Sequence, residues 1–224
     1  MTGEPQRRLD ERPLLQDHPG AVRLALVLLA LGLFVFIALA IPALADIVQS
    51  VDDWAYEVAI DLEASVAVTL AKALDFIGST WVTAPVIVLV GVYLIFRRRW
   101  EALTFWFLAM LGSQLLIGPM KNLYERARPP LPLVETSGYS FPSGHAVAGA
   151  AIAVSLVIVL VPAGPKRRNL EMLAAAFAVL MALSRVYLRA HWLSDALGGA
   201  ALGAAVAIGT ALLVHRIDGM RAGR

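Results

Sequence analysis

The stretch that decides the fold is residues 184–214, SRVYLRAHWLSDALGGAALGAAVAIGTALLV, which joins a polar segment to a long apolar run. Residues 184–195 carry two arginines, a histidine and an aspartate, whereas residues 196–214 carry no charge. About 20 consecutive apolar residues are enough for a helix to cross the hydrocarbon of a bilayer. The stretch therefore predicts a membrane-spanning helix that begins beside a polar, titratable segment.

The same pattern recurs along the rest of the chain. Uncharged runs of comparable length cover residues 24–45, 76–96, 102–120 and 146–165. A sixth run, 170–187, is interrupted only by Glu171 and Arg185 near its ends, where an interface or a polar cavity accommodates a charge. With 59% hydrophobic residues, 16% charged residues and a mean hydropathy of +0.72, the sequence predicts an all-α polytopic membrane protein, a bundle of six transmembrane helices.

These spans leave little room for anything besides a membrane domain. We expect one domain at residues 21–215, a flexible cytoplasmic tail at 1–20 and a second cytoplasmic tail at 216–224. Ala-Leu-Ala at 38–40 and 43–45 resembles a signal-peptidase site, but the apolar run is longer than the roughly 7–15 residues of a signal core, so retention of the first span is favoured. Cysteine is absent, which excludes disulfides and thiolate chemistry.

Residues 46–75 are less informative, but apolar residues recur at helical spacing between Val51 and Leu62. One interpretation is a helix that lies in the membrane interface, with Trp54 and Tyr56 at the level of the headgroups. The other is a short helix packed against the spans. The sequence leaves both open.

Positive charge is distributed unevenly about the predicted spans. Most of the 19 lysines and arginines lie on one side, in the two tails and in the runs 97–99 and 166–168. The positive-inside bias therefore places both termini in the cytoplasm of a cell membrane. Three polar segments, 121–129, 142–145 and 184–195, then reach the opposite, non-cytoplasmic face, where we expect them to form one site.

The first of these segments is KNLYERARP at 121–129. Lys121 and Arg128 are seven residues apart, so a helix that continued through both would place the two cations on one face. Two fixed cations at a helix end suit an anion. The plain alternative is a pair of cations that snorkel at the interface.

The second segment is PSGH at 142–145, directly before an apolar run. Ser143 is a natural N-cap residue, and the free amides around Ser143 and Gly144 at a helix N-terminus can bind an anion. Pro-Ser-Gly alone also fits an ordinary turn before a helix. His145 adds a titratable group beside those amides.

The third segment is the most specific of the three. His191 and Asp195 are four residues apart at the predicted start of a span, so we expect them to share a helical face. The carboxylate can then keep one imidazole nitrogen protonated while the other stays free as a nucleophile. Arg185 adds a guanidinium whose planar fork matches phosphate oxygens.

Together the segments read Lys-x6-Arg-Pro, Pro-Ser-Gly-His and Ser-Arg-x5-His-x3-Asp. In this order they resemble the three motifs of the type 2 phosphatidic acid phosphatase (PAP2) superfamily. The resemblance covers residues 121–195 at the level of motifs, and the predicted six spans extend it over the rest of the chain. The superfamily's site also resembles that of vanadium haloperoxidases, where vanadate takes the place of phosphate.

The resemblance implies a metal-independent lipid phosphate phosphatase that needs no cofactor. His191 would attack phosphorus to form a phosphohistidine, Asp195 would orient it, and His145 would protonate the leaving oxygen and then activate water. The phosphoryl oxygens would be held by Lys121, Arg128, Ser143, Gly144 and Arg185. Arg126 and Arg189 lie outside the motifs and are candidate headgroup contacts. A cavity with this many cations would repel a divalent metal ion.

The substrate class implied by the resemblance is a phosphate carried by a membrane lipid. Bacterial members of similar size act on undecaprenyl diphosphate, phosphatidylglycerol phosphate or phosphatidic acid, and we favour the polyprenyl diphosphate. The expected partners are this lipid phosphate and the membrane, with no indication of nucleic acid or of an obligate protein partner. The alternatives are a lipid phosphotransferase, a non-catalytic membrane protein that binds lipid phosphates, and a haloperoxidase, although haloperoxidases are soluble.

Overall fold

The computed structural model describes residues 19–162 and 164–222, and these residues form eight helices. The helices are α1 (Pro19–Ala40), α2 (Pro42–Asp61), α3 (Ser65–Gly78), α4 (Thr80–Phe96), α5 (Trp100–Tyr124), α6 (Gly144–Leu160), α7 (Pro165–Tyr187) and α8 (Leu193–Ala222). Most of the predicted tail at 1–20 lies outside the described residues. At the other terminus, α8 continues without a break through residue 216 to Ala222.

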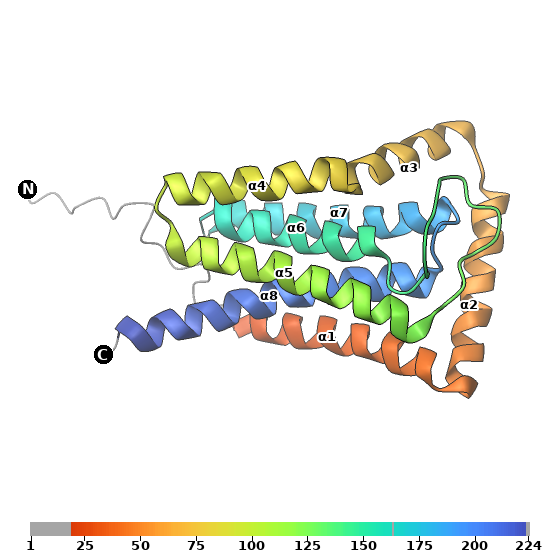
Figure 1. Cartoon of the computed structure of the whole chain (residues 1–224), viewed down its shortest axis with the longest axis horizontal. Coiled ribbons are helices and arrows are strands. Elements are labelled where there is room, and N and C mark those ends of the chain that lie inside the picture. The colour runs from red at the N-terminus through yellow and green to blue at the C-terminus, as the bar shows by residue number, and fades with distance from the viewer. Residues whose placement is uncertain (1–18, 163, 223–224) are drawn as a thin grey trace, which may run out of the picture.

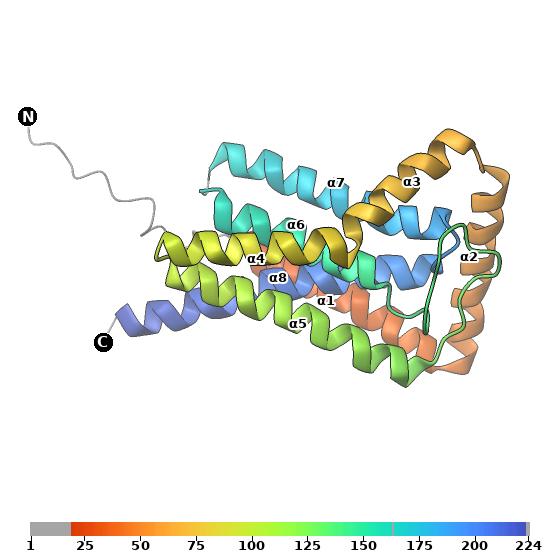
Figure 2. The same ribbon diagram turned by 45° about the horizontal axis from the view of Figure 1, so that its top comes forward.

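Six of the helices run along one axis, and α2 lies across one end of them (Figure 1). The bundle consists of α1, α4, α5, α6, α7 and α8, with α3 leading from α2 into α4 (Figure 2). α3 and α4 meet at a bend of 44°. Ser79 forms the break between them, since it is both the C-cap residue of α3 and the N-cap residue of α4.

The protein is an all-α membrane protein, and each of the six predicted spans overlaps one of the helices α1, α4, α5, α6, α7 and α8. The runs 24–45 and 76–96 are interrupted, at Ile41 and at Ser79. Four helices are long and apolar enough to cross a membrane, and the bent pair α3 and α4 makes a fifth candidate. α6 is apolar but shorter, with 17 residues. The segment at 46–75 forms two helices, of which α2 buries Asp52, Ala55 and Ala59 on one face and exposes Trp54 on the other.

Glycines allow α6 and α8 to pack closely beside the motif segments. A Cβ at Gly203 would lie 2.2 Å from the carbonyl oxygen of Val147, and one at Gly199 would lie 3.1 Å from that of Ser143. The lack of side chains therefore lets the two backbones approach. The amide of Ser143 also donates to the carbonyl oxygen of Asp195 at 3.1 Å, so the first turns of α6 and α8 are fixed to each other.

This contact predicts that Gly203→Ala destabilises the protein. The new methyl group would meet a backbone carbonyl, which cannot rotate away as a side chain can, and we expect a loss of about 1–3 kcal/mol in the free energy of unfolding. Thermal unfolding in detergent measures the effect. Gly209→Ala on the same helix is the matched control, because no described atom lies within 4 Å of its added Cβ. Equal unfolding midpoints for the two variants would contradict the packing.

Candidate active site

The three polar segments meet at the end of the bundle that α2 crosses (Figure 1). The loop between α5 and α6 carries Arg128, the first turn of α6 carries His145, and the loop between α7 and α8 carries His191. Hydrogen bonds between the segments join residues that are far apart in the sequence, such as the side chains of Arg128 and His191 and the backbones of Ser143 and Asp195. The predicted convergence of the motifs is therefore present in the structure.

The His191–Asp195 pair is present, but its geometry differs from the predicted shared helical face. α8 begins at Leu193, so His191 lies in the preceding loop and only Asp195 lies in the helix. The distance from His191 Nδ1 to Asp195 Oδ2 is 3.8 Å. The same oxygen accepts hydrogen bonds from the amide of Trp192 at 3.0 Å and from the hydroxyl of Ser140. Asp195 thus caps the start of α8 as well as facing the imidazole.

The other ring nitrogen of His191 lies against a cation. His191 Nε2 is 3.1 Å from Arg128 Nη1. A guanidinium can only donate, so this contact requires Nε2 to carry a lone pair and Nδ1 to carry the proton. Burial lowers the pKa of His191 to about 4, and the nearby Asp195 opposes this shift only in part. The imidazole is therefore neutral near pH 7, with its free nitrogen beside Arg128.

Arg128 and Lys121 come together, although not on one helix face as predicted. α5 ends at Tyr124, and Glu125 has a left-handed backbone with φ of 43°, so Arg128 lies in the loop. Lys121 Nζ and Arg128 Nη2 both donate to the carbonyl oxygen of Tyr139, the latter at 3.2 Å. The pKa of Arg128 is lowered, first by burial and then by the neighbouring cation Arg185. Like charges are therefore held close together.

Two buried donors of the motifs have no hydrogen-bond partner among the described residues, namely Ser143 Oγ and Arg185 Nε. Ser143 is the N-cap residue of α6, as predicted, but its hydroxyl makes no capping hydrogen bond. Arg185 lies in the last turn of α7 and uses Nη1 to bind the carboxylate of Asp75 on α3. Gly144 begins α6, as the sequence predicted. Buried donors without partners are uncommon and costly, which suits a site that binds an anion.

His145 lies beside Arg185, with Asp75 between them. Its Nε2 is 3.2 Å from Asp75 Oδ1, and the same carboxylate oxygen contacts Arg185 Nη1. A Cβ at Gly78 would lie 2.6 Å from the His145 ring, so the end of α3 packs directly against the imidazole. Nothing in the sequence motifs indicated Asp75. In the residues that the structure describes, no group of three or more His, Asp or Glu side chains could hold a metal ion.

The two arginines outside the motifs are both paired with carboxylates of the protein. Arg189 Nη2 lies 3.1 Å from Glu63 Oε2. Arg126 Nη1 lies 2.6 Å from Asp195 Oδ1, and its Nη2 lies 2.7 Å from Asp52 Oδ2. Sequence analysis predicted neither pairing.

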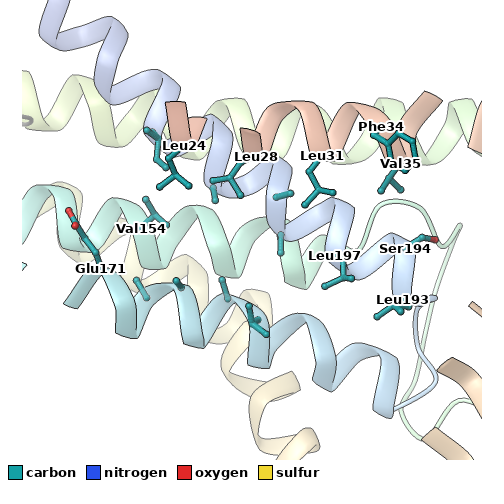
Figure 3. Close-up of a pocket in the computed structure, with 18 of the residues that line it drawn as sticks. Leu24, Leu28, Leu31, Phe34, Val35, Val154, Glu171, Leu193, Ser194 and Leu197 are labelled. Atoms are coloured by element: carbon teal, nitrogen blue, oxygen red, sulfur yellow. The ribbon is translucent and has the colours of Figure 1, made fainter. Parts of the chain in front are cut away.

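An apolar groove of about 860 Å³ runs along the bundle and reaches Leu193 and Ser194 of the third motif segment. It is lined by α1, α2, α6, α7 and α8, with Leu24 and Leu31 among its α1 residues. Figure 3 shows Glu171 towards one end of the groove and Leu193 and Ser194 towards the other. Ser194, at this end of the groove, directly precedes Asp195 in the sequence.

Comparisons with known proteins agree with the geometry. The family model of the PAP2 superfamily matches residues 102–218. Phosphatidylglycerophosphatase B of Bacillus subtilis (strain 168) is 31% identical over 175 residues, which cover 75% of this chain and 85% of that protein.

Two solved structures are similar over most of their length. The crystal structure of a transmembrane PAP2 type phosphatidylglycerolphosphate phosphatase from Bacillus subtilis has a TM-score of 0.71 and 30% identity, and the match covers 86% of this chain and 96% of that one. Aquifex aeolicus LpxE has a TM-score of 0.55 and 18% identity, over 72% and 92% of the two chains, which indicates a shared fold.

Proposed function

Because the chain belongs to the PAP2 superfamily and is a membrane lipid phosphatase, we propose that it hydrolyses the terminal phosphate of phosphatidylglycerol phosphate through a phosphohistidine on His191. The motifs do not separate the candidate headgroups, and the resemblance to small bacterial members of the family placed a polyprenyl diphosphate only slightly ahead. The relative that is 31% identical is named for phosphatidylglycerophosphate, and we therefore favour that lipid as the substrate.

The observation that carries the proposal is a pair of buried donors without partners in the same site as the unprotonated imidazole nitrogen of His191. Ser143 Oγ and Arg185 Nε are buried without partners, and Arg128 holds His191 Nε2 at 3.1 Å. A buried donor without a partner costs about 1–3 kcal/mol, and phosphoryl oxygens would remove that cost. Lys121 and the amide of Gly144 complete the proposed set of phosphate-binding groups.

The chemistry proceeds in two steps. His191 Nε2 attacks phosphorus, the bond between phosphorus and the lipid oxygen breaks, and His145 donates a proton to that oxygen. Asp195 stabilises the positive charge that develops on His191. Water then attacks the phosphohistidine, His145 takes a proton from it, and inorganic phosphate leaves with His191 restored. The cations stabilise the negative charge of both transition states.

The apolar groove supports a lipid substrate over a water-soluble phosphate. Its lining is almost entirely hydrocarbon, and its volume lies in the range of about 300–1,000 Å³ that is usual for ligand sites. The groove reaches Ser194, which directly precedes Asp195. A lipid chain in the groove would keep its phosphate close to the end of the bundle where the motifs meet.

The proposed topology has six spans, with α4 and α6 as the shortest helices at 17 residues each, and places both termini in the cytoplasm. The arginine run 97–99 between α4 and α5 and the basic run 166–168 at the start of α7 lie at the end of the bundle opposite the motifs (Figure 1). The positive-inside rule then places the active site on the periplasmic or extracellular side.

Phosphate release from purified protein in detergent tests the function. With excess chelator and no acceptor lipid, we expect free phosphate from phosphatidylglycerol phosphate, with kcat/KM roughly tenfold or more above that for undecaprenyl diphosphate and phosphatidic acid. Equal values for all three lipids would overturn the substrate assignment. A requirement for a divalent metal would overturn the mechanism, and phosphate transfer that occurs only with an acceptor lipid present would favour a phosphotransferase.

A further inference from the structure

We propose that α2 is part of the catalytic apparatus: Asp52 on α2, acting through Arg126 and Ser194, positions the Asp195 carboxylate that orients His191. The inference rests on the proposed function, because it takes His191 as the nucleophile. Neither Asp52 nor Arg126 belongs to the three motifs, and both act as positioning residues, since neither contacts His191 in the structure.

Arg126 links two carboxylates with a single rigid group. Its Nη1 lies 2.6 Å from Asp195 Oδ1, and its Nη2 lies 2.7 Å from Asp52 Oδ2. The guanidinium is planar, so fixing one terminal nitrogen on Asp52 also fixes the direction in which the other approaches Asp195. Gln49 Oε1 accepts a further hydrogen bond from Nη2 at 2.8 Å, which places a second α2 residue on the same group.

Asp52 also holds the backbone from which Asp195 projects. Asp52 Oδ1 accepts a hydrogen bond from the amide of Ser194 at 2.8 Å, and its Oδ2 accepts one from the Ser194 hydroxyl at 2.6 Å. A carboxylate at the first turn of a helix satisfies free amides and is favoured by the helix dipole. Asp52 therefore fixes the start of α8 directly and the side chain of Asp195 through Arg126.

The two oxygens of Asp195 have different partners, and this division assigns a task to Arg126. Oδ2 faces His191 Nδ1 at 3.8 Å and also binds the amide of Trp192. Oδ1 accepts a hydrogen bond from Arg126. The distance of 3.8 Å is longer than a hydrogen bond. A carboxylate freed at Oδ1 could rotate and lose its alignment with the ring, so the support on Oδ1 should control how well His191 is oriented.

The same contacts would also stabilise the fold, so a test must separate the two roles. Asp52 and Asp195 are 1% and 0% exposed, and removing one member of a buried ion pair is usually strongly destabilising. A purely structural role predicts that each variant loses folded protein while the remaining folded protein keeps its turnover. A positioning role predicts a lower kcat in protein that is fully folded.

The experiment measures kcat and KM of the full chain in detergent for Asp52→Asn, Arg126→Gln and Arg126→Lys, after gel filtration has isolated folded protein. We expect kcat to fall roughly 10- to 100-fold for Asp52→Asn and Arg126→Gln, with KM unchanged, because a small misplacement of a catalytic group has effects of this size. Arg126→Lys retains one donor and should recover part of the loss.

Glu63→Gln is the matched control. Glu63 follows α2 and pairs with Arg189, a residue of the loop that carries His191, at 3.1 Å, but it has no link to Asp195. We expect its kcat to stay within about twofold of wild type. Ser194→Ala is a milder variant for use if the others do not fold. It removes the Ser194 hydroxyl, which bridges Asp52 and Arg126, and keeps both charges. A reduced kcat at unchanged KM is expected for it as well.

A double-mutant cycle decides the assignment. In an Asp195→Asn background, Arg126→Gln should add less than about twofold, since the carboxylate that it supports is no longer a charged partner of His191. Either of two results would overturn the inference while leaving the proposed function intact. One is a loss of kcat for Arg126→Gln that is as large in the Asp195→Asn background as in the wild-type background. The other is a kcat like that of Glu63→Gln for all the variants. A wild-type protein that releases no phosphate from any of the lipids would instead overturn the proposed function.

Discussion

His191→Ala is expected to lower the rate of phosphate release by about 10³-fold or more, because the nucleophile of a covalent mechanism has no substitute. His191 Nε2 is the unprotonated imidazole nitrogen beside Arg128, and the neutral ring can attack phosphorus near pH 7. Phosphate release from phosphatidylglycerol phosphate under chelator, at saturating lipid, measures the loss. Substrate binding should change much less than turnover, since the phosphate-binding cations remain.

His215→Ala is the matched control for this variant. His215 lies near the far end of α8 from the motifs, and its removal should leave the rate within about twofold of wild type. Activity of His191→Ala above about a tenth of wild type would be inconsistent with a nucleophilic role and would require another attacking group.

The second large effect is expected for His145→Ala, and its size should depend on the leaving group. We expect a loss of about 10²–10⁴-fold with a lipid phosphate, whose alkoxide must be protonated as it leaves. With a nitrophenyl phosphate presented in the same micelles, the leaving group needs little protonation, so the formation of the phosphoenzyme should be affected far less. Steady-state turnover would still be slow, because His145 also activates the water of the second step.

The dependence on the leaving group separates a general acid from a residue that only shapes the site. Burst kinetics report the first step with the nitrophenyl substrate, and phosphate release reports the second. An equal loss in the burst rate for both kinds of substrate would show that His145 acts on binding or structure, because a missing proton donor penalises a basic leaving group most.

The sequence predicted the helices well because hydrophobic runs are a local property. The runs 102–120 and 196–214 lie inside α5 and α8. The break at Ser79 inside the run 76–96 lies in the sequence Gly78-Ser79-Thr80, whose signals for a helix end and a helix start do not register in a count of uncharged residues. There the end of α3 packs against His145, which is a tertiary contact with no counterpart in the local sequence.

The motif segments were predicted to lie together, and the structure brings them together, whereas the predicted local geometry of Arg128 and His191 was wrong. Two cations seven residues apart suggested one continuous helix, but Glu125 takes a left-handed backbone and ends α5 before Arg128. Left-handed conformations are uncommon for residues other than glycine, so the residue type at position 125 did not indicate a helix end there. His191 lies outside α8, because Asp195 accepts a hydrogen bond from the amide of Trp192 and so caps the helix at a point after His191.

The carboxylates that surround the motifs were missed because their partners are distant in the sequence. Asp75 binds Arg185 across 110 residues, and Asp52 binds Ser194 across 142 residues. One signal was present for Asp52: it shares a helical face with Ala55 and Ala59, the small residues that α2 buries. A charge on the apolar face of an amphipathic helix is costly without a partner, and it indicates one elsewhere in the fold.

The most direct test of the account is rapid-quench labelling of the His145→Ala variant with a nitrophenyl phosphate that carries radioactive phosphorus. Slow hydrolysis should let the phosphoenzyme accumulate, with label that is stable in base, lost in acid and located on His191. His145→Ala combined with His191→Ala should take up none. Label on another residue, or turnover by the single variant with no labelled protein, would contradict a phosphohistidine at His191.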